Sequence, residues 1–101
     1  MATTTKALFR GAATTTLTTG LYTSGASTTA VVTNIVVSNA AATASTVTVA
    51  INAINLLPTV SIPANSVATF DLKQVVPAST TVTGGASTTA VSIHISGVEI
   101  A

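Results

Sequence analysis

The sequence predicts an all-β fold: a single β-sandwich of about seven to eight short antiparallel strands, with a small β-barrel as the alternative. Stretches of alternating apolar and polar residues, rich in Val, Ile and Thr, recur along the chain. Turn-forming residues separate these stretches roughly every 8–12 residues, a spacing typical of sandwiches and barrels. No stretch has the periodicity of an amphipathic helix.

Two long strands are predicted most clearly, at Thr29–Asn39 and Ser45–Ile51, because apolar residues alternate there and β-branched residues dominate. One apolar face is expected from Val31, Thr33, Ile35 and Val37, and another from Val47, Val49 and Ile51. Shorter strands are expected at Val60–Ile62, Val67–Leu72, Thr80–Thr83 and Ala90–Ile95. Turns are expected at Asn52–Asn55, Pro63–Ser66 and Gly84-Gly85, and a bulge at Gly97.

The first twenty residues, Met1–Gly20, are rich in Thr and Ala and show little periodicity. We interpret them as an extended N-terminal arm, followed by a sandwich domain over residues 21–101. Such an arm could bind a neighbouring protein by strand addition. The candidate partner-binding residues are the one apolar and basic cluster in this segment: Ala7, Leu8, Phe9 and Arg10.

The composition suggests a single domain whose surface is not left free. The chain has 101 residues, no Cys and a net charge of +1, and only 5% of its residues are charged. Typical soluble domains contain about 25% charged residues, and a free monomer depends on surface charge for solubility. We therefore expect one Thr-rich face that stays exposed and one apolar face that is buried in an assembly.

Nucleic acid and membrane are excluded as predicted partners. Three cations and three aromatic residues are too few for phosphate neutralisation or base stacking. The apolar runs are far shorter than the ~18 residues of a membrane span. The N-terminal residues also lack the apolar core of a secretory signal peptide.

The candidates for acid–base chemistry are Asp71, His94 and Glu99. A triad of His94, Asp71 and a serine would need a nucleophile elbow, and no Gly-x-Ser-x-Gly motif is present. A metal site needs three or four ligands. We therefore predict no enzyme, no catalytic residue, no metal, no cofactor and no small-molecule substrate. His94 is expected on the outward or mixed face of its strand, and Asp71 with Lys73 is expected to form a weak surface pair.

The heptapeptide GASTTAV occurs twice, at Gly25–Val31 and Gly85–Val91. The flanking sequences do not repeat, so a duplicated half-domain has little support. We interpret both copies as equivalent turns that lead into strands, with each glycine in the turn and Val31 and Val91 buried where the strands start. The alternative is a pair of ligand-binding loops.

Five stretches of the chain carry a resemblance: Arg10-Gly11, Leu21–Thr23, Ile35–Asn39, Val60–Ser66 and His94–Glu99. With these stretches the sequence resembles small β-sandwich virion proteins of tailed bacteriophages, which serve as capsid decoration proteins or as minor structural proteins of head and tail. The resemblance implies a structural role in a virus particle. It brings no catalytic residue with it.

The expected function is that of a capsid decoration or cement protein that binds the outer surface of the assembled capsid and stabilises it. Its partners would be the major capsid protein and further copies of itself, as a trimer or another symmetric homo-oligomer. The protein would be made in the host cytoplasm and end up on the virion. The alternative is a minor tail or fibre-associated module for host adhesion, in which a sugar site is disfavoured because Tyr22 and two Phe are the only aromatic residues. A small hydrolase is a third possibility.

Overall fold

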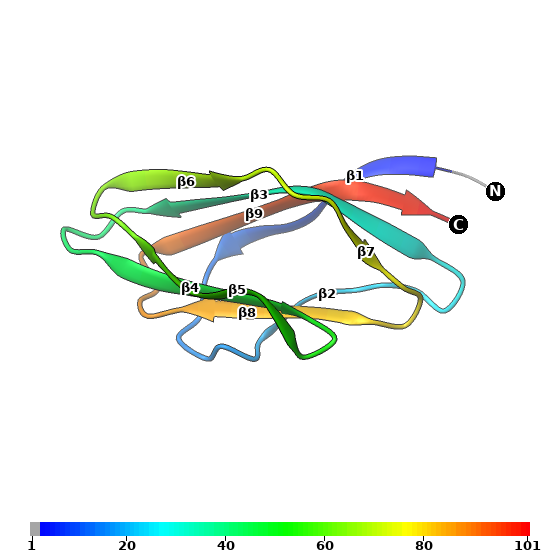
Figure 1. Cartoon of the computed structure of the whole chain (residues 1–101), viewed down its shortest axis with the longest axis horizontal. Coiled ribbons are helices and arrows are strands. Elements are labelled where there is room, and N and C mark those ends of the chain that lie inside the picture. The colour runs from blue at the N-terminus through cyan, green and yellow to red at the C-terminus, as the bar shows by residue number, and fades with distance from the viewer. Residues whose placement is uncertain (1–2) are drawn as a thin grey trace.

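The computed structural model describes residues 3–101 as nine strands, with no helix among them (Figure 1). The strands are β1 (Thr3–Ala12), β2 (Gly20–Thr23), β3 (Thr29–Asn39), β4 (Ser45–Ile51), β5 (Ile54–Ile62), β6 (Ser66–Phe70), β7 (Gln74–Val76), β8 (Thr81–Ala86) and β9 (Val91–Ile100). They form two antiparallel sheets that pack face to face. The predicted β-sandwich is therefore confirmed.

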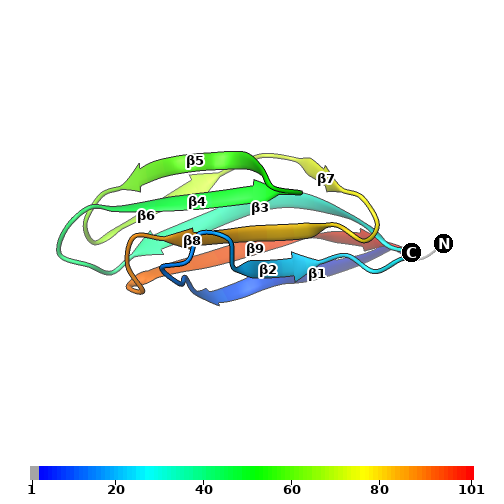
Figure 2. The ribbon, with the colours of Figure 1, turned by 90° about the horizontal axis from the view of Figure 1, so that it is seen from below.

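Each sheet collects strands that are far apart in the sequence. The five-stranded sheet has the order β1-β9-β3-β6, with β7 paired to the first part of β3. The four-stranded sheet has the order β2-β8-β4-β5. Figures 1 and 2 show the two layers from two directions, with the chain passing repeatedly from one layer to the other.

The strands pair antiparallel about the central β4–β5 hairpin, so segments at similar distances before and after this hairpin lie side by side. Strand β1 pairs with β9, β2 with β8, β3 with β6 and β7, and β4 with β5. Representative paired residues, moving outward from the β4–β5 hairpin, are Ile51 and Ile54, Ile35 and Phe70, Tyr22 and Val82, and Thr3 and Ile100. If β6 and β7 are counted as one interrupted strand, this is the eight-stranded order of a jelly roll.

A two-residue turn joins β4 to β5 in this central hairpin. Asn52 (φ 52°) and Ala53 (φ 63°) both adopt left-handed backbone conformations, which a type I′ hairpin turn requires. The turn predicted at Asn52–Asn55 is thus confirmed for its first two residues. The turn predicted at Pro63–Ser66 is also present, with Asn65 at φ 53°.

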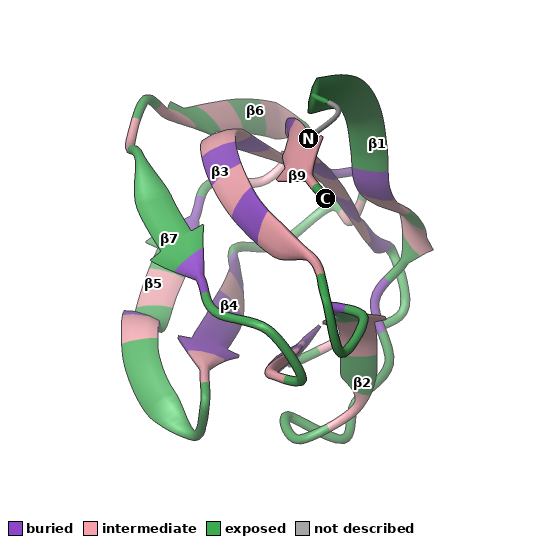
Figure 3. Ribbon diagram, turned by 90° about the vertical axis from the view of Figure 1, so that its right-hand side faces the viewer, coloured by how far each residue is buried: buried purple, intermediate pink, exposed green. Residues whose placement is uncertain are grey.

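The core lies between the sheets and is built almost entirely of aliphatic side chains. Figure 3 shows buried residues alternating with more exposed ones along β3. The aromatic residues Phe9, Tyr22 and Phe70 are half-buried and pack against this core. Its largest fully buried aliphatic members are Ile35, Ile62, Ile93, Ile95, Val32, Val37, Val47, Val49, Val76, Val82 and Val91.

The predicted inward face of β3 is wrong in its first half. Pairing with β9 shifts register between Val32 and Asn34, so Thr33 is an additional residue in β3. Such a bulge exchanges the two faces of a strand. Consequently Val32 is buried and Val31 is not, whereas Ile35 and Val37 are buried as predicted.

The bulge predicted at Gly97 lies on the neighbouring strands instead. Strand β9 continues through Gly97, and the register shifts are at Leu8 in β1 and Thr33 in β3. The Thr33 hydroxyl donates a hydrogen bond to the Ser96 carbonyl (3.1 Å), which fastens the β3 bulge to β9. Gly97 is therefore enclosed between two bulged strands.

The expected N-terminal arm is wrong for residues 3–12. These residues form β1, which pairs with β9 along its full length and is an edge strand of the sandwich. Leu8 is only 6% exposed and belongs to the core, so the sandwich begins at Thr3 and not at residue 21. Met1 and Ala2, which the arm prediction also covered, lie outside the described residues.

The two GASTTAV copies adopt different structures, so their interpretation as equivalent turns is wrong. Gly25 begins a turn in which the Thr28 amide donates to the Gly25 carbonyl (3.2 Å). Gly85, by contrast, is buried within β8 and pairs with Thr48, which also overturns the turn predicted at Gly84-Gly85. Val91 is buried at the start of β9, whereas Val31 is only half-buried.

Candidate functional site

The outer face of the five-stranded sheet carries a patch of aliphatic side chains. Strand pairing places Val31 beside Val75 on one side and Val98 on the other. Val67 is 64% exposed and Val75 is 60% exposed, both high values for large apolar residues. We call this patch the valine face: Val31, Val36, Val67, Val75, Val98 and Ile100.

Two basic groups interrupt the valine face. Arg10 on β1 lies opposite His94 on β9, and His94 lies opposite Val36 on β3. The predicted outward or mixed position of His94 is confirmed, because it alternates with the buried Ile93 and Ile95. The valine face is therefore mixed: Thr69 and His94 flank Val36, Ser38 lies beside Val67, and Arg10 lies at the β1 edge.

The carboxylates have partners other than His94. Asp71 lies 3.9 Å from Lys73 and both side chains are highly exposed, so the predicted weak surface pair is confirmed. Glu99 binds Tyr22 and Lys6. Within residues 3–101 no three His, Cys, Asp or Glu side chains are grouped as metal ligands would be.

The four predicted partner-binding residues do not form one surface. Ala7 and Arg10 are exposed, Phe9 is half-buried against the core, and Leu8 is buried within it. Leu8 therefore cannot contact a partner while the sandwich is folded. Binding through Ala7, Phe9 and Arg10 stays a prediction.

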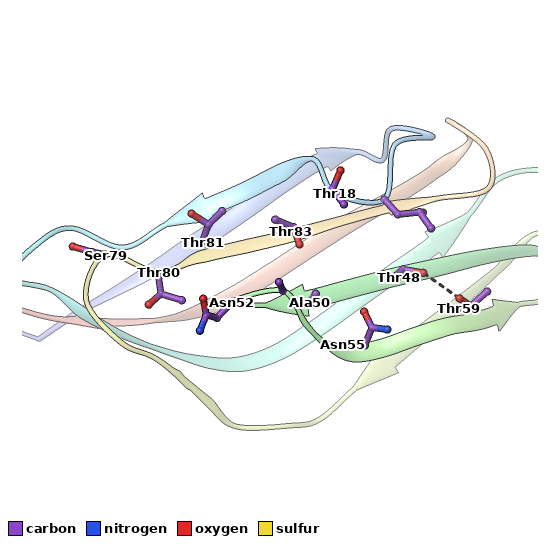
Figure 4. A pocket seen from close by; sticks show the side chains of 12 residues that line it. Thr18, Thr48, Ala50, Asn52, Asn55, Thr59, Ser79, Thr80, Thr81 and Thr83 are labelled. Atoms are coloured by element: carbon purple, nitrogen blue, oxygen red, sulfur yellow. Dashed lines mark hydrogen bonds between the residues drawn. The ribbon is translucent and has the colours of Figure 1, made fainter.

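The outer face of the four-stranded sheet has the opposite character, with hydroxyl and amide groups around a hollow of about 570 Å³ (Figure 4). We call it the threonine hollow. Strands β4, β5 and β8 form its floor, and the β4–β5 and β7–β8 turns form one end. Its main polar side chains are Thr48, Thr59, Thr81, Thr83, Asn52 and Asn55.

A threonine-rich loop forms the remaining wall of the hollow. The Thr16 carbonyl accepts hydrogen bonds from the hydroxyls of Thr14 (3.0 Å) and Thr19 (2.9 Å), which closes the loop on itself. The amides of Gly84 and Ala86 in β8 donate to the Thr19 and Thr14 carbonyls, both at 2.9 Å. The loop is thus fixed to β8, and it holds Leu17 and Thr18 at the rim.

Gly85 is the position that lets this loop approach the sheet. A Cβ atom there would lie 2.5 Å from the Thr16 carbonyl oxygen and 2.8 Å from that of Thr14. The sequence predicts an exposed Thr-rich face, but it does not indicate which threonines gather. The signal that could have identified them is the Thr-x-Thr pattern of Thr46–Thr48 and Thr81–Thr83, which places hydroxyls on the outward side of β4 and β8.

A small polar cluster joins the two sheets near the chain termini. The Tyr22 hydroxyl donates to Glu99 Oε2 (2.5 Å), and Lys6 Nζ lies 3.4 Å from Glu99 Oε1. Burial raises the pKa of Tyr22 to about 12, and the hydrogen bond to Glu99 and the charge of Glu99 add to the increase. The pKa of Glu99 is lowered by the hydrogen bond from Tyr22 and by the ammonium group of Lys6. Partial burial of Glu99 acts in the opposite direction and raises its pKa.

We expect an alkaline absorbance titration to show Tyr22 ionising near pH 12 in the folded protein. The signal is unambiguous because the chain has one Tyr and no Trp. A raised pKa favours the neutral phenol in the folded state. The contribution of Tyr22 to stability is therefore complete below pH 10 and is lost as the pH rises to about 12.

The variant Glu99→Gln separates the causes of this shift. Because burial contributes most, the midpoint should fall but remain above 10. Denatured protein provides the reference at the ordinary tyrosine value. A midpoint near 10 in the folded wild type would contradict the geometry of the Tyr22–Glu99 contact.

The described residues contain no helix that is long and apolar enough to span a membrane. No protein-family model matches the chain, and no curated protein matches it.

Proposed function

We propose that this chain is a non-enzymatic structural protein of a bacteriophage virion, which decorates the outside of the assembled capsid and stabilises it. The observation that carries the proposal is the difference between the two outer faces of the sandwich. The valine face exposes Val67 and Val75, although Ser38, Thr69 and His94 lie between its valines. The opposite face gathers hydroxyl and amide groups around the threonine hollow, with Leu17 exposed at the rim. Exposed valines on one face and hydroxyl groups on the other suit a protein that docks through one face onto a larger assembly.

The energy of docking would come from burying the valine face. Val67 and Val75 are both more than half exposed, so their burial against a partner removes apolar area from water at about 25 cal/mol per Å². Arg10 at the β1 edge would give the contact an orientation if the capsid surface is acidic there.

Two further observations support the assignment to a virus particle. The sequence resembles small virion proteins of tailed phages in the stretches named above, and jelly rolls are one of the folds used by viral coat domains. A fold is not a function, so the topology is compatible with the proposal without carrying it. The alternative is a tail or fibre-associated adhesion module, which the polar hollow on the opposite face favours.

Counting copies in purified phage particles tests the proposal directly. Quantitative mass spectrometry should find hundreds of copies per particle if the chain decorates the capsid. A handful of copies would overturn the capsid position in favour of the tail module. Absence from the particles would overturn the virion assignment altogether.

Binding to undecorated capsids tests the docking face. The charged variants Val67→Lys and Val75→Lys should fold, because both positions are exposed, and each should weaken binding in a sedimentation assay at least tenfold. Ser61→Lys is the matched control, since it places the same charge on an exposed position of the four-stranded sheet. If all three variants bind equally, the valine face is not the docking surface.

A further inference from the structure

We propose that the threonine hollow is a binding site for a neutral carbohydrate. The inference is independent of the virion proposal, because it concerns the opposite face of the sandwich and rests on other residues. The volume of about 570 Å³ lies within the range of sites that bind small organic molecules.

Several polar side chains around the hollow have no partner inside the protein. The side chains of Thr18, Asn52, Asn55, Ser79 and Thr83 make no hydrogen bond to another group within residues 3–101, and all but Thr83 are exposed to solvent. Figure 4 shows them on the Thr-rich loop, both turns and the floor strands, with the Ser79 side chain pointing away from the others. They supply hydroxyl and amide groups that can both donate and accept, so they are available to a ligand.

The backbone around the hollow is strained. Five non-glycine residues within residues 3–101 have positive φ, and four of them line the hollow: Asn52, Ala53, Thr59 and Ser79. The type I′ turn accounts for the first two. Thr59 (φ 52°) is a β-branched residue in a conformation such residues rarely adopt, and its hydroxyl lies 3.4 Å from that of Thr48. Unfavourable backbone conformations of this kind gather at ligand sites, where they fix side chains in place.

The lining selects the class of ligand. The hollow has no charged side chain among the described residues, so it offers nothing to neutralise an anion or a cation. Leu17, Ala50 and Ala53 supply apolar surface beside the hydroxyls and amides. A sugar matches this combination, because it presents hydroxyl groups along its edge and C–H groups on its ring face.

The affinity should be modest. The hollow offers no aromatic ring for stacking, because Phe9, Tyr22 and Phe70 pack against the core. Leu17 supplies apolar contact with the sugar ring instead. Hydrogen bonds that replace bonds to water contribute only about 0.5–1.5 kcal/mol each. We expect a Kd of about 1 mM for a single site. Several copies held on one surface would bind a polysaccharide more tightly through avidity.

An NMR titration of the full chain tests the proposal. The probes are neutral sugars (glucose, galactose, mannose, N-acetylglucosamine and their disaccharides), with glucuronate and inorganic phosphate as charged comparisons. At least one neutral sugar should shift the amide signals of Asn52, Asn55, Thr81 and Thr83 along one saturable curve. The charged probes should shift them less.

Two variants remove lining groups without touching the core. Thr83→Val keeps the side-chain shape, and Asn55→Ala truncates an exposed amide; each should raise the Kd about fivefold, the equivalent of one lost hydrogen bond. Ser61→Ala is the control, because Ser61 is an exposed residue of β5 outside the hollow. The proposal is overturned if no neutral sugar gives saturable shifts up to ~100 mM, a hundredfold above the expected Kd. Shifts that are the same in all three variants, or that follow only the charged probes, would overturn it as well.

Discussion

Replacement of Gly97 by alanine is expected to lower the free energy of unfolding by about 3 kcal/mol, a large share of the 5–15 kcal/mol typical of a small domain. A Cβ atom at this position would collide with the Val31 carbonyl oxygen and would lie 3.0 Å from Leu8 Cδ1. The first of these atoms belongs to the backbone of a paired strand. It can move only if the pairing of β3 with β9 is disturbed.

The two bulges beside Gly97 make this position less tolerant than an ordinary glycine in a strand. Leu8 and Thr33 are the additional residues of β1 and β3, and both bulges lie next to the residues that pair with Ser96 and Gly97. Because β9 lies between these two strands, it cannot shift away from one without approaching the other. The strain therefore affects the whole five-stranded sheet.

Chemical denaturation measures this effect, and Gly11→Ala is the matched control. Gly11 lies on β1 and pairs with the same strand, but a Cβ atom there would meet only the Phe9 ring at 3.4 Å. We expect the control to change the free energy of unfolding by no more than about 0.5 kcal/mol. Equal denaturation midpoints for the two alanine variants would mean that the contact with Val31 is relieved at no cost.

The sequence predicts best the bounds of the two long strands that lie inside the sheets. Both Thr29–Asn39 and Ser45–Ile51 are strands with their predicted bounds and pair on both sides, although the bulge at Thr33 breaks the predicted alternation of the first. Predictions failed where a distant segment decides the local structure. Thr3–Ala12 is a strand because β9, at the far end of the chain, pairs with it. Gly85 lies in a strand because β4 pairs with it, and a glycine is needed there because the Thr14–Thr19 loop passes close above it.

The chemistry of the candidate surfaces was predictable, but their geometry was not. Low charge and abundant Thr predict an exposed Thr-rich face and an apolar face buried in an assembly; the structure has a hydroxyl-lined hollow on one sheet and exposed valines on the other, and burial in an assembly stays a prediction. Pattern reasoning cannot show that Asn52, Thr59 and Thr83 line one hollow, because two different strand pairings, β4 with β5 and β4 with β8, bring them together. Pattern reasoning also cannot predict that Leu8 is buried. Its burial depends on a bulge in β1, and no residue type in β1 indicates that bulge.

The second large effect is expected at Asn39, the most completely bonded polar side chain of the core. Asn39 is 2% exposed. Its amide nitrogen donates to the carbonyls of Thr43 (3.0 Å), Ile62 (3.1 Å) and Pro63 (3.2 Å). Its carbonyl oxygen accepts from the Ala41 amide (2.9 Å) and lies 3.4 Å from Ser45 Oγ. One side chain thus ties the β3–β4 loop to the β5–β6 turn, across the two sheets.

Asn39→Asp is expected to destabilise the protein by about 3–5 kcal/mol at pH 7, the usual consequence of an uncompensated buried charge. The change keeps the size of the side chain but replaces its donor group with a carboxylate oxygen that faces the Ile62 and Pro63 carbonyls. Denaturant midpoints of the variant and the wild type measure the difference. Asn65→Asp is the control: Asn65 lies in the adjacent β5–β6 turn, is exposed, and has a φ of 53° that aspartate also tolerates.

The pH dependence of this variant identifies the cause of its instability. Burial beside carbonyl groups should raise the folded-state pKa of the introduced Asp above the unfolded value of about 3.9, because the charged form is disfavoured. A raised pKa means that the folded state binds the proton more tightly than the unfolded state. The deficit relative to wild type should therefore be largest above the folded-state pKa and should shrink as the pH falls below it. A deficit that is constant down to pH 3 would show that lost hydrogen bonds, and not buried charge, account for the loss of stability.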